Sequence, residues 1–257
     1  MNELDINNPQ LPDFIVPGAD EKKQDEPAKI KVIGVGGGGG NAVNHMYHQG
    51  IGGVSFVLCN TDAQALRNSP VPVKVQLGAK GEGAGNIPEV AKKLAEESAS
   101  EVEALFDDNT RMAFITAGMG GGTGTGAAPV VARIAKEKGV LTVGIVTIPF
   151  LFEGEPKILQ AFAGVEEMRK HVDALLVINN ERLCKIYPDL SWTTAFAKAD
   201  DSLSNAARSI AELVSKDGKI NLDFADVRTT LKDGGAAVIS TGSGEGEHRM
   251  SRAIKTH

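Results

Sequence analysis

The residues best suited to chemistry form a loop rich in glycine and threonine near the middle of the chain. Residues 118–126 read Gly-Met-Gly-Gly-Gly-Thr-Gly-Thr-Gly, so six of the nine are glycine and two are threonine. An apolar run, Met112–Thr116, precedes this loop, and a helix-like run, Ala127–Lys138, follows it. Glycine lets the backbone approach a ligand closely, and the N–H groups at a helix start attract anions. The loop is therefore typical of a phosphate-binding site, with two hydroxyl groups as further donors.

A second glycine-rich run, Gly34–Gly40, has six glycines in seven residues. It overlaps the end of a strand-like segment, Lys29–Val35, and Asn41 opens the helix expected after it. Because each run lies between a strand and a helix, a flexible linker is a poor interpretation of either one. Loops at the carboxyl ends of parallel strands converge on one crevice. We therefore expect the two runs to supply enough backbone donors for a di- or triphosphate.

The same run also allows a dinucleotide-binding interpretation. Gly34, Gly36 and Gly39 fit the pattern G-x-G-x-x-G. That fold expects an acidic residue at the end of the next strand, where it binds a ribose hydroxyl. Here that strand ends at Asn60, and Asp62 comes two residues later. A lysine-containing G-x-x-x-x-G-K-S/T loop does not occur in the sequence. A Rossmann-type NAD(P)-dependent oxidoreductase is the main alternative function.

Strand-like and helix-like segments alternate along the chain. The expected strands are 29–35, 54–59, 71–77, 112–116, 141–146, 174–178 and 236–240. The expected helices are 41–49, 88–97, 100–106, 127–138, 156–170, 191–216, 224–232 and one that begins near 247. This alternation predicts an α/β fold, a Rossmann-like and mostly parallel sheet flanked by helices. The segment 191–216 has apolar residues at i, i+3, i+4 and i+7, which predicts a long central helix.

Composition divides the chain into three parts. Residues 1–28 carry four prolines among charged and amide side chains, which predicts a disordered N-terminal extension. Residues 29–217 hold the predicted sheet and the long helix, and form one domain. Residues 218–257 contain one predicted strand and two helices, too few to close a core. We interpret this last part as a loop and the start of a truncated second α+β domain.

Charge and cysteine content exclude several classes of protein. The net charge is −6 and no basic cluster occurs, so nucleic-acid binding is not expected. No apolar run approaches the roughly 20 residues needed to cross a membrane. Cys59 and Cys184 each lie in or beside an apolar segment, which favours buried free thiols in a reducing cytoplasm. His45 and His48 lack further ligands nearby in the sequence, so no protein metal site is predicted.

Five motifs, in order, resemble those of the FtsZ family of bacterial cell-division GTPases, within the tubulin superfamily. They lie at residues 34–41, 60–66, 120–126, 152–154 and 221–228. The similarity runs from Lys29 to about Gly244 and is closer to FtsZ than to eukaryotic tubulin. It implies a tubulin-like GTPase domain in a member of the family that is shortened at its C-terminus.

The resemblance implies a binding site for GTP or GDP. The residues implied to hold the phosphates are Gly37, Gly38, Gly39, Gly40, Asn41, Gly120, Gly121, Gly122, Thr123, Gly124 and Thr125. Glu153 is implied to bond the ribose, and Asn180 to contact the nucleotide. Phe196 is implied to stack on guanine, and Asp201 to accept hydrogen bonds from its N1–H and amino groups. Lys157 stands where the family has a sugar-contacting arginine, and lysine lacks the planar fork of that residue.

The resemblance also implies that catalytic groups come from a different segment. Asn221, Asp223 and Asp226 are implied to act on the nucleotide of the next subunit. A water would attack the γ-phosphate, with Mg²⁺ as the counter-ion. Spacing alone instead favours Asp223 as a helix N-cap and Asp226 as an acid of the first turn. The two aspartates lie three residues apart, which would place them on one face of a helix.

The implied function is GTP hydrolysis coupled to head-to-tail assembly into filaments at the cytoplasmic mid-cell division site. The implied partners are further copies of the chain, and other division proteins and membrane tethers that bind a C-terminal tail absent from this sequence. Neither nucleic-acid binding nor direct membrane insertion is expected. A scaffold that binds GTP without hydrolysing it is a further alternative, and the oxidoreductase interpretation stays open.

Overall fold

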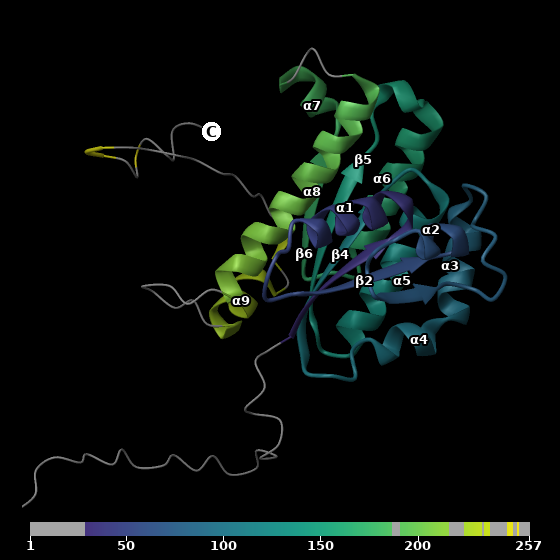
Figure 1. Ribbon diagram of the computed structural model, residues 1–257, viewed down its shortest axis with the longest axis horizontal. Helices are drawn as coiled ribbons and strands as arrows, with labels where there is room; N and C mark the ends of the chain where they lie inside the picture. Colours follow the sequence, from purple (N-terminus) through teal and green to yellow (C-terminus); the bar gives the residue numbers. More distant parts are fainter. Residues whose placement is uncertain are drawn as a thin grey trace, which may run out of the picture.

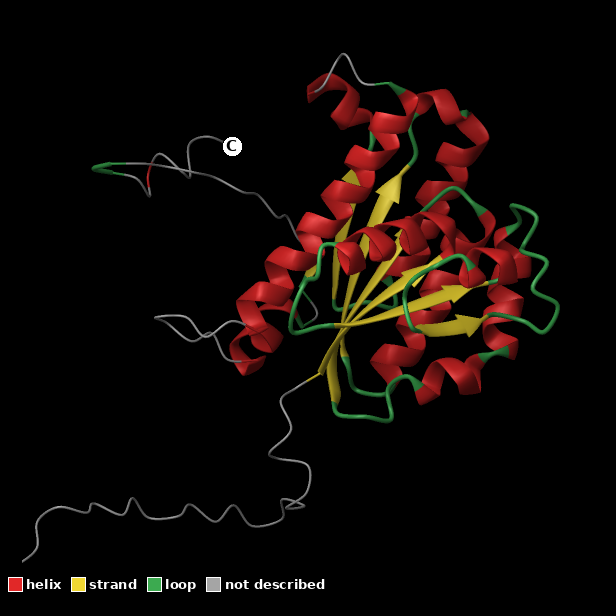
Figure 2. Cartoon of the chain, in the orientation of Figure 1, coloured by secondary structure: helices red, strands yellow, loops and turns green. Residues whose placement is uncertain are grey.

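The computed structural model describes residues 29–186, 191–215, 224–232, 234–236, 246–248 and 251. Within this part of the chain, seven strands form one sheet in the order β3-β2-β1-β4-β5-β6-β7, with helices on both faces (Figure 1). Every neighbouring pair of strands is parallel. Figure 2 shows the strands fanning out between two layers of helices. The predicted Rossmann-like parallel fold is therefore confirmed.

The strands are β1 (Lys29–Val35), β2 (Ser55–Asn60), β3 (Val73–Gln76), β4 (Thr110–Gly118), β5 (Leu141–Ile148), β6 (Ala174–Asn179) and β7 (Gly235–Ala236). The α-helices are α1 (Gly36–His48), α2 (Ala63–Arg67), α3 (Pro88–Glu97), α4 (Ala99–Ala104), α5 (Gly122–Glu137), α6 (Glu155–Arg169), α7 (Glu181–Ile186), α8 (Trp192–Ser215) and α9 (Phe224–Leu231). A short 3₁₀ helix, η1 (Leu151–Glu153), precedes α6.

Two short helices, α2 and α7, were not expected from the sequence. The side chain of Asp62 caps α2, because its Oδ1 accepts the N–H groups of Gln64 at 2.8 Å and Ala65 at 3.3 Å. Most of the strand expected at 236–240 and most of the helix expected from 247 lie outside the described residues, as does the N-terminal extension 1–28.

Two apolar cores lie on opposite faces of the sheet. One core joins the sheet to α3, α4, α5 and α6. The other joins it to α1, α2, α8 and α9. The parallel strands β4 and β5 are buried along nearly their whole length, as expected for strands covered on both faces. Within the described residues, no helix combines the length and the apolar character needed to span a membrane.

The starts of α1 and α5 differ from the sequence-based expectation. The sequence favours helices from Asn41 and Ala127, since glycine is a poor helix former. The structure instead begins α1 at Gly36 and α5 at Gly122, inside the glycine runs. Tertiary packing overrides propensity here, because the helices begin close to neighbouring backbone, and a Cβ at Gly39 or Gly126 would lie 2.2 Å or 1.9 Å from a carbonyl oxygen. The glycines are therefore the first turns of helices.

The prediction for the cysteines is confirmed for one thiol. Cys59 on β2 is free and fully buried, and burial raises the pKa of its thiol to about 12. A thiol with such a high pKa is not a nucleophile at neutral pH. Cys184 on α7 is also free but only half-buried.

We expect alanine to be tolerated at Gly40 but not at Gly126, although each is the fifth residue of its helix. A Cβ at Gly126 would lie 1.9 Å from the carbonyl oxygen of Pro88, whereas at Gly40 the nearest atom, Cδ2 of Leu58, is 4.0 Å away. Gly126→Ala should lower the free energy of unfolding by about 1–3 kcal/mol through overpacking. Gly40→Ala should leave it unchanged or raise it by up to about 1 kcal/mol. Urea unfolding followed by circular dichroism measures both, and equal stability of the two variants would contradict the packing argument.

Candidate functional site

A cavity of about 470 Å³ opens at the carboxyl ends of β1, β4, β5 and β6. This volume falls within the roughly 300–1,000 Å³ typical of small-molecule sites. The cavity lies where the strand order reverses between β1 and β4, which is the usual place for a ligand in an open parallel sheet. Its lining residues are Gly37, Gly38, Asn41, Gly118, Met119, Gly121, Gly122, Thr123, Gly124, Thr147, Pro149, Glu153, Asn180, Phe196, Ala199, Asp200 and Leu203.

One end of the cavity is formed by the N-termini of α1 and α5. Both helices begin directly after a strand or its loop, and Gly37 and Gly122 in their first turns line the cavity. The hydroxyl oxygens of Thr61 and Thr123 lie 2.7 Å apart, which ties the first turn of α5 to the segment after β2. Two helix N-termini directed at one space bring unpaired N–H groups and positive dipole ends together. This end of the cavity is suited to an anion with several negative charges.

The structure does not bring every predicted phosphate residue to the cavity. Thr125 faces inward, and its Oγ1 accepts the N–H of Gly120 at 2.9 Å. Gly39 is buried, and a Cβ there would lie 2.2 Å from the carbonyl oxygen of Thr116. Gly40 and Gly120 are also absent from the lining. The predicted residues that do line it are Gly37, Gly38, Asn41, Gly121, Gly122, Thr123, Gly124, Glu153, Asn180 and Phe196.

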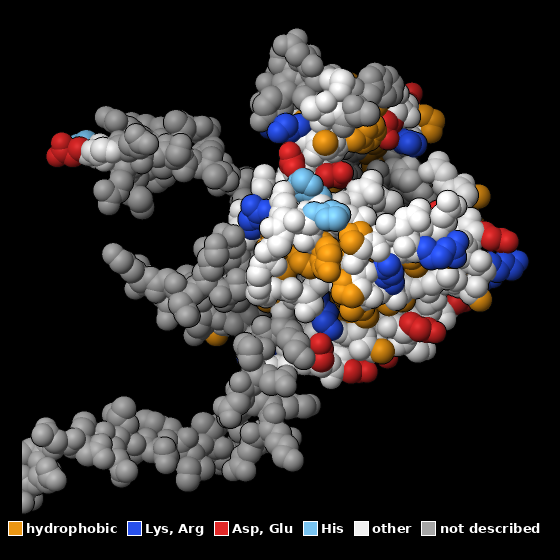
Figure 3. Space-filling view, in the orientation of Figure 1, with side chains coloured by type: hydrophobic (Ala, Val, Ile, Leu, Met, Phe, Trp, Pro, Cys, Tyr) orange, Lys and Arg blue, Asp and Glu red, His pale blue; other side chains and the backbone are white. Residues whose placement is uncertain are grey.

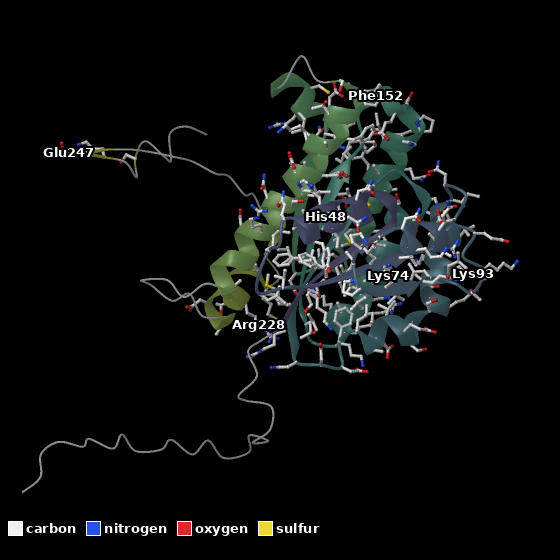
Figure 4. All side chains as sticks on the ribbon, in the orientation of Figure 1. His48, Lys74, Lys93, Phe152, Arg228 and Glu247 are labelled. Atoms are coloured by element: carbon white, nitrogen blue, oxygen red, sulfur yellow. The ribbon has the colours of Figure 1, made fainter. Side chains whose placement is uncertain are left out.

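One aromatic side chain, Phe196, lines the cavity, and two further rings pack against it. The rings of Phe150 and Phe152 stack with centroids 4.9 Å apart, and Phe196 meets Phe150 edge-on at 5.3 Å. Figure 4 shows Phe152 at the end of the molecule where β5 terminates. The side chain of Phe196 is 43% exposed and lines the cavity. Phe196 therefore offers an accessible ring on which a planar base could stack.

A buried amide oxygen lies in the same region. Asn180 follows β6, lines the cavity and is only 5% exposed. Its Oδ1 has no hydrogen-bond partner among the described residues. Buried polar atoms normally have a partner, so an unpaired acceptor in a cavity wall indicates a ligand that donates to it.

The structure places Asp200, and not Asp201, in the cavity wall. Oδ1 of Asp201 lies 2.8 Å from Nε2 of His45 on α1, and its Oδ2 lies 3.5 Å from Nζ of Lys198. Figure 3 shows histidine and acidic side chains side by side on the visible surface. Successive helical residues point about 100° apart, so one position decides which side a carboxylate faces. The expectation for Asp201 is therefore not supported by its position.

The spacing along α8 could have identified Asp200. Phe196, Ala199, Asp200 and Leu203 occur at i, i+3, i+4 and i+7, and all four line the cavity. Asp201 lies off this stripe. Burial raises the pKa of the Asp200 carboxyl to about 6, with His45 lowering it and Asp201 raising it. A perturbed carboxyl group in a cavity wall is a common mark of a functional site.

Glu153 and Lys157 form a pair at the mouth of the cavity. Oε1 of Glu153 accepts the N–H of Phe150 at 3.0 Å, and its Oε2 lies 3.3 Å from Nζ of Lys157. Glu153 lines the cavity, whereas Lys157 does not. Lys157 therefore contacts the carboxylate that is predicted to bind the ribose.

The described part of the predicted catalytic segment lies away from this cavity. Asn221 and Asp223 fall outside the described residues. Asp226 is exposed on α9, whose following strand β7 pairs with the first residues of β6 through Gly235 and Ala174. That is the amino-terminal edge of the sheet, opposite the cavity. Figure 4 shows Arg228 on α9 at the far end of α8 from Phe152. The 24 residues of α8 span about 36 Å, so Asp226 does not reach the cavity of its own chain.

The chain matches one family and several known proteins. The model for the GTPase domain of the tubulin/FtsZ family matches residues 29–188. The cell division protein FtsZ of Porphyromonas gingivalis is 66% identical over 232 residues, which cover 89% of this chain and 51% of that protein. The FtsZ of Wigglesworthia glossinidia brevipalpis is 50% identical over 230 residues, covering 88% and 60%. The chain thus spans about half the length of the curated relatives it matches.

A solved structure agrees with these matches. An empty FtsZ dimer from M. jannaschii superimposes with a TM-score of 0.84 and is 44% identical, covering 90% of this chain and 68% of that one. Its agreement extends over nearly the whole described fold. Because the family model also covers more than half of the residues, the chain belongs to the tubulin/FtsZ family, with its GTPase domain at residues 29–188.

Proposed function

We propose that this chain binds guanine nucleotides and hydrolyses GTP to GDP and phosphate. The observation that carries the proposal is a cavity with two helix N-termini at one end, and with the ring of Phe196, an unpaired amide oxygen and a carboxylate in its remaining wall. Phosphates suit the end with the helix N-termini, because N–H groups and helix dipoles favour negative charge there. A purine base suits the remaining wall. The family match to a GTPase domain supports the same assignment.

Guanine is the base that fits the polar groups. A carboxylate at Asp200 accepts hydrogen bonds from both the N1–H and the amino group of guanine, whereas adenine presents an acceptor at N1. Asn180 offers a second acceptor and Phe196 a stacking surface. In this proposal Asp200 takes the role that the sequence had suggested for Asp201. Glu153, held by Lys157, bonds the ribose.

Hydrolysis is proposed to need two copies of the chain. Asp226 lies at the sheet edge opposite the cavity, so a head-to-tail neighbour is the simplest source of Asn221, Asp223 and Asp226 for the nucleotide. Such a heterologous contact does not close and therefore generates a filament. The M. jannaschii relative described as a dimer supports self-association. The acids would orient the attacking water in this arrangement.

Mg²⁺ is proposed to enter together with GTP. Among the described residues, no group of three or more His, Cys, Asp or Glu side chains could hold a metal ion. The phosphate end of the cavity offers N–H groups and threonine hydroxyls instead. Mg²⁺ often keeps several waters and binds through substrate phosphates, which agrees with this lining. Its contribution would be to neutralise charge on the β- and γ-phosphates.

The biological role is proposed by relationship. The relatives are cell division proteins, so we infer that the chain acts in bacterial division, in the cytoplasm at mid-cell. Contacts with other division proteins and membrane tethers are proposed to involve sequence beyond the matched region, since this chain spans only about half of its relatives.

The oxidoreductase alternative is disfavoured because no carboxylate is available at the end of β2 to bind a ribose. A dinucleotide site needs an acid at the end of β2 to bind a ribose. That position is Asn60, whose Oδ1 accepts the N–H of Asp62 at 3.2 Å. The carboxylate of Asp62 caps α2 and is therefore occupied. Saturable binding of GDP without binding of NAD would separate the two functions.

Asp200→Asn should change the base that the site prefers. Affinity for GDP should fall about 10- to 100-fold, because a hydrogen-bonded carboxylate is lost. Affinity for xanthosine diphosphate should rise, because an amide can donate to its 2-oxo group. Asp201→Asn is the matched control and should leave the preference for guanine unchanged. Calorimetric titration measures both ligands, and a loss of preference in the Asp201 variant alone would refute the assignment.

Nucleotide affinity should also depend on pH. The Asp200 carboxyl must be ionised to accept two N–H groups, and its pKa in the free protein is about 6. Affinity for GDP should therefore be constant above pH 7 and fall about tenfold per pH unit once the pH drops below 6. Asp200→Asn should remove the part of this dependence that the carboxyl group causes and keep only the part due to the terminal phosphate of GDP, whose second pKa is about 6. Calorimetric titrations with GDP between pH 5 and pH 8, at about one sample per half pH unit, test this prediction. An unchanged pH profile in the variant would argue against Asp200 as the group that controls affinity.

Asp226→Asn should separate binding from hydrolysis. GDP affinity should equal that of the original chain, whereas phosphate release should fall about 100-fold or more through loss of a group that positions water. Release per molecule should rise with protein concentration, because a neighbour must supply the acid. Phosphate release is measured for this chain and for a version extended to the length of its relatives. Turnover independent of protein concentration would favour an acid from the same chain, and binding without any turnover in the extended version would favour a scaffold.

A further inference from the structure

One side chain outside the cavity binds two carbonyl groups of the central glycine loop. Nε2 of Gln160, on α6, lies 3.1 Å from the carbonyl oxygen of Gly120 and 3.2 Å from that of Gly121. The same nitrogen lies 3.5 Å from the carbonyl oxygen of Asn86. Gln160 is half-buried, and none of the sequence motifs contains it. Its amide group thus joins α6 to the segment that leads into α5.

Peptide geometry links these bonds to the cavity. In a planar trans peptide the C=O and N–H groups point in opposite directions, and the described residues contain no cis peptide bond. The carbonyl of Gly120 shares a peptide unit with the N–H of Gly121, and the carbonyl of Gly121 shares one with the N–H of Gly122. Because Gln160 holds both carbonyls on the side of α6, the two N–H groups are turned to the opposite side. Gly121 and Gly122 both line the cavity.

This part of the backbone needs such a restraint. Gly120 has a φ of +98°, in the region that favours glycine, and two more glycines follow it. Consecutive glycines have many accessible conformations, so their peptide units can rotate at little cost. Thr125 already holds the N–H of Gly120. Gln160 binds the carbonyl group of the same residue. Without it, a rotated peptide would direct a carbonyl oxygen, and not an N–H group, at a bound anion.

We propose that Gln160 is a positioning residue for the phosphates of the nucleotide, acting through the peptide units of Gly120, Gly121 and Gly122. The proposal rests on the nucleotide function proposed above. Gln160 does not touch the ligand itself. It orients two backbone donors, so its effect should depend on the phosphates and be absent for a ligand that lacks them.

The surroundings of Gln160 make it suitable for substitution. It also lines a second cavity, of about 420 Å³, between α3, α5 and α6. Side chains of similar length can therefore be placed there without overpacking. Gln76, at the end of β3, is a matched control, because its Nε2 also donates to two successive carbonyls, those of Gly78 at 2.8 Å and Ala79 at 3.2 Å. Gln76 does not line the nucleotide cavity.

The test compares Gln160→Leu with Gln76→Leu for binding of GTP, GDP and guanosine by calorimetric titration. Gln160→Leu should lose about tenfold in affinity for GTP and GDP, since charge-assisted bonds from two N–H groups are weakened. Its affinity for guanosine should change by less than about twofold. Gln76→Leu should leave all three affinities unchanged. Gln160→Lys, which restores a donor of similar reach, should recover most of the affinity for GDP.

Each outcome decides a different question. If the original chain binds neither GDP nor guanosine, the proposed function fails. If it binds both and Gln160→Leu keeps the original ratio of GDP to guanosine affinity, the positioning role of Gln160 is overturned. Should Gln160→Leu not fold, Gln160→Glu provides the second test, because its carboxylate would repel the two carbonyls. An unchanged affinity ratio in Gln160→Glu would likewise overturn the proposal.

Discussion

Close contact between backbone and backbone at the carboxyl end of β4 is the constraint on which the site depends. A Cβ at Gly39 would lie 2.2 Å from the carbonyl oxygen of Thr116, and one at Gly124 would lie 2.3 Å from that of Gly118. Only glycine permits these approaches. Because α1 and α5 can begin so near the strand, their N-termini converge on one cavity. The convergence of the two helix N-termini is therefore a consequence of packing that excludes side chains at these positions.

Glycine provides this closeness but does not by itself fix the direction of each peptide. Side-chain hydrogen bonds restrain this part of the backbone. Thr125 binds the N–H of Gly120, Thr61 binds Thr123, and Gln160 binds the carbonyls of Gly120 and Gly121. The bonds made by Thr125 and Gln160 satisfy backbone groups, which normally need a partner when buried. A flexible loop is thereby converted into a prearranged set of donors.

The long helix α8 extends from the side of the molecule near α7 to the side near α9 (Figure 1). Its first turns supply Phe196 and Asp200 to the cavity, and the chain that follows it returns to the amino-terminal edge of the sheet. The cavity and Asp226, one of the proposed catalytic acids, thus lie at opposite edges of the sheet. This arrangement agrees with the head-to-tail assembly proposed above.

The sequence by itself determined the parallel α/β fold and the two glycine runs, because alternating apolar segments and glycine spacing are local patterns. Its resemblance to the FtsZ family added Glu153, Asn180 and Phe196, which also line the cavity. The sequence could not determine where α1 and α5 begin, since glycine's poor helix propensity is overcome only by contacts with β4. It also could not separate Asp200 from Asp201, or show that Thr125 faces inward. Those outcomes depend on which side of each helix packs against the sheet. The role of Gln160 arises for the same reason, because α6 meets the loop only in the folded chain.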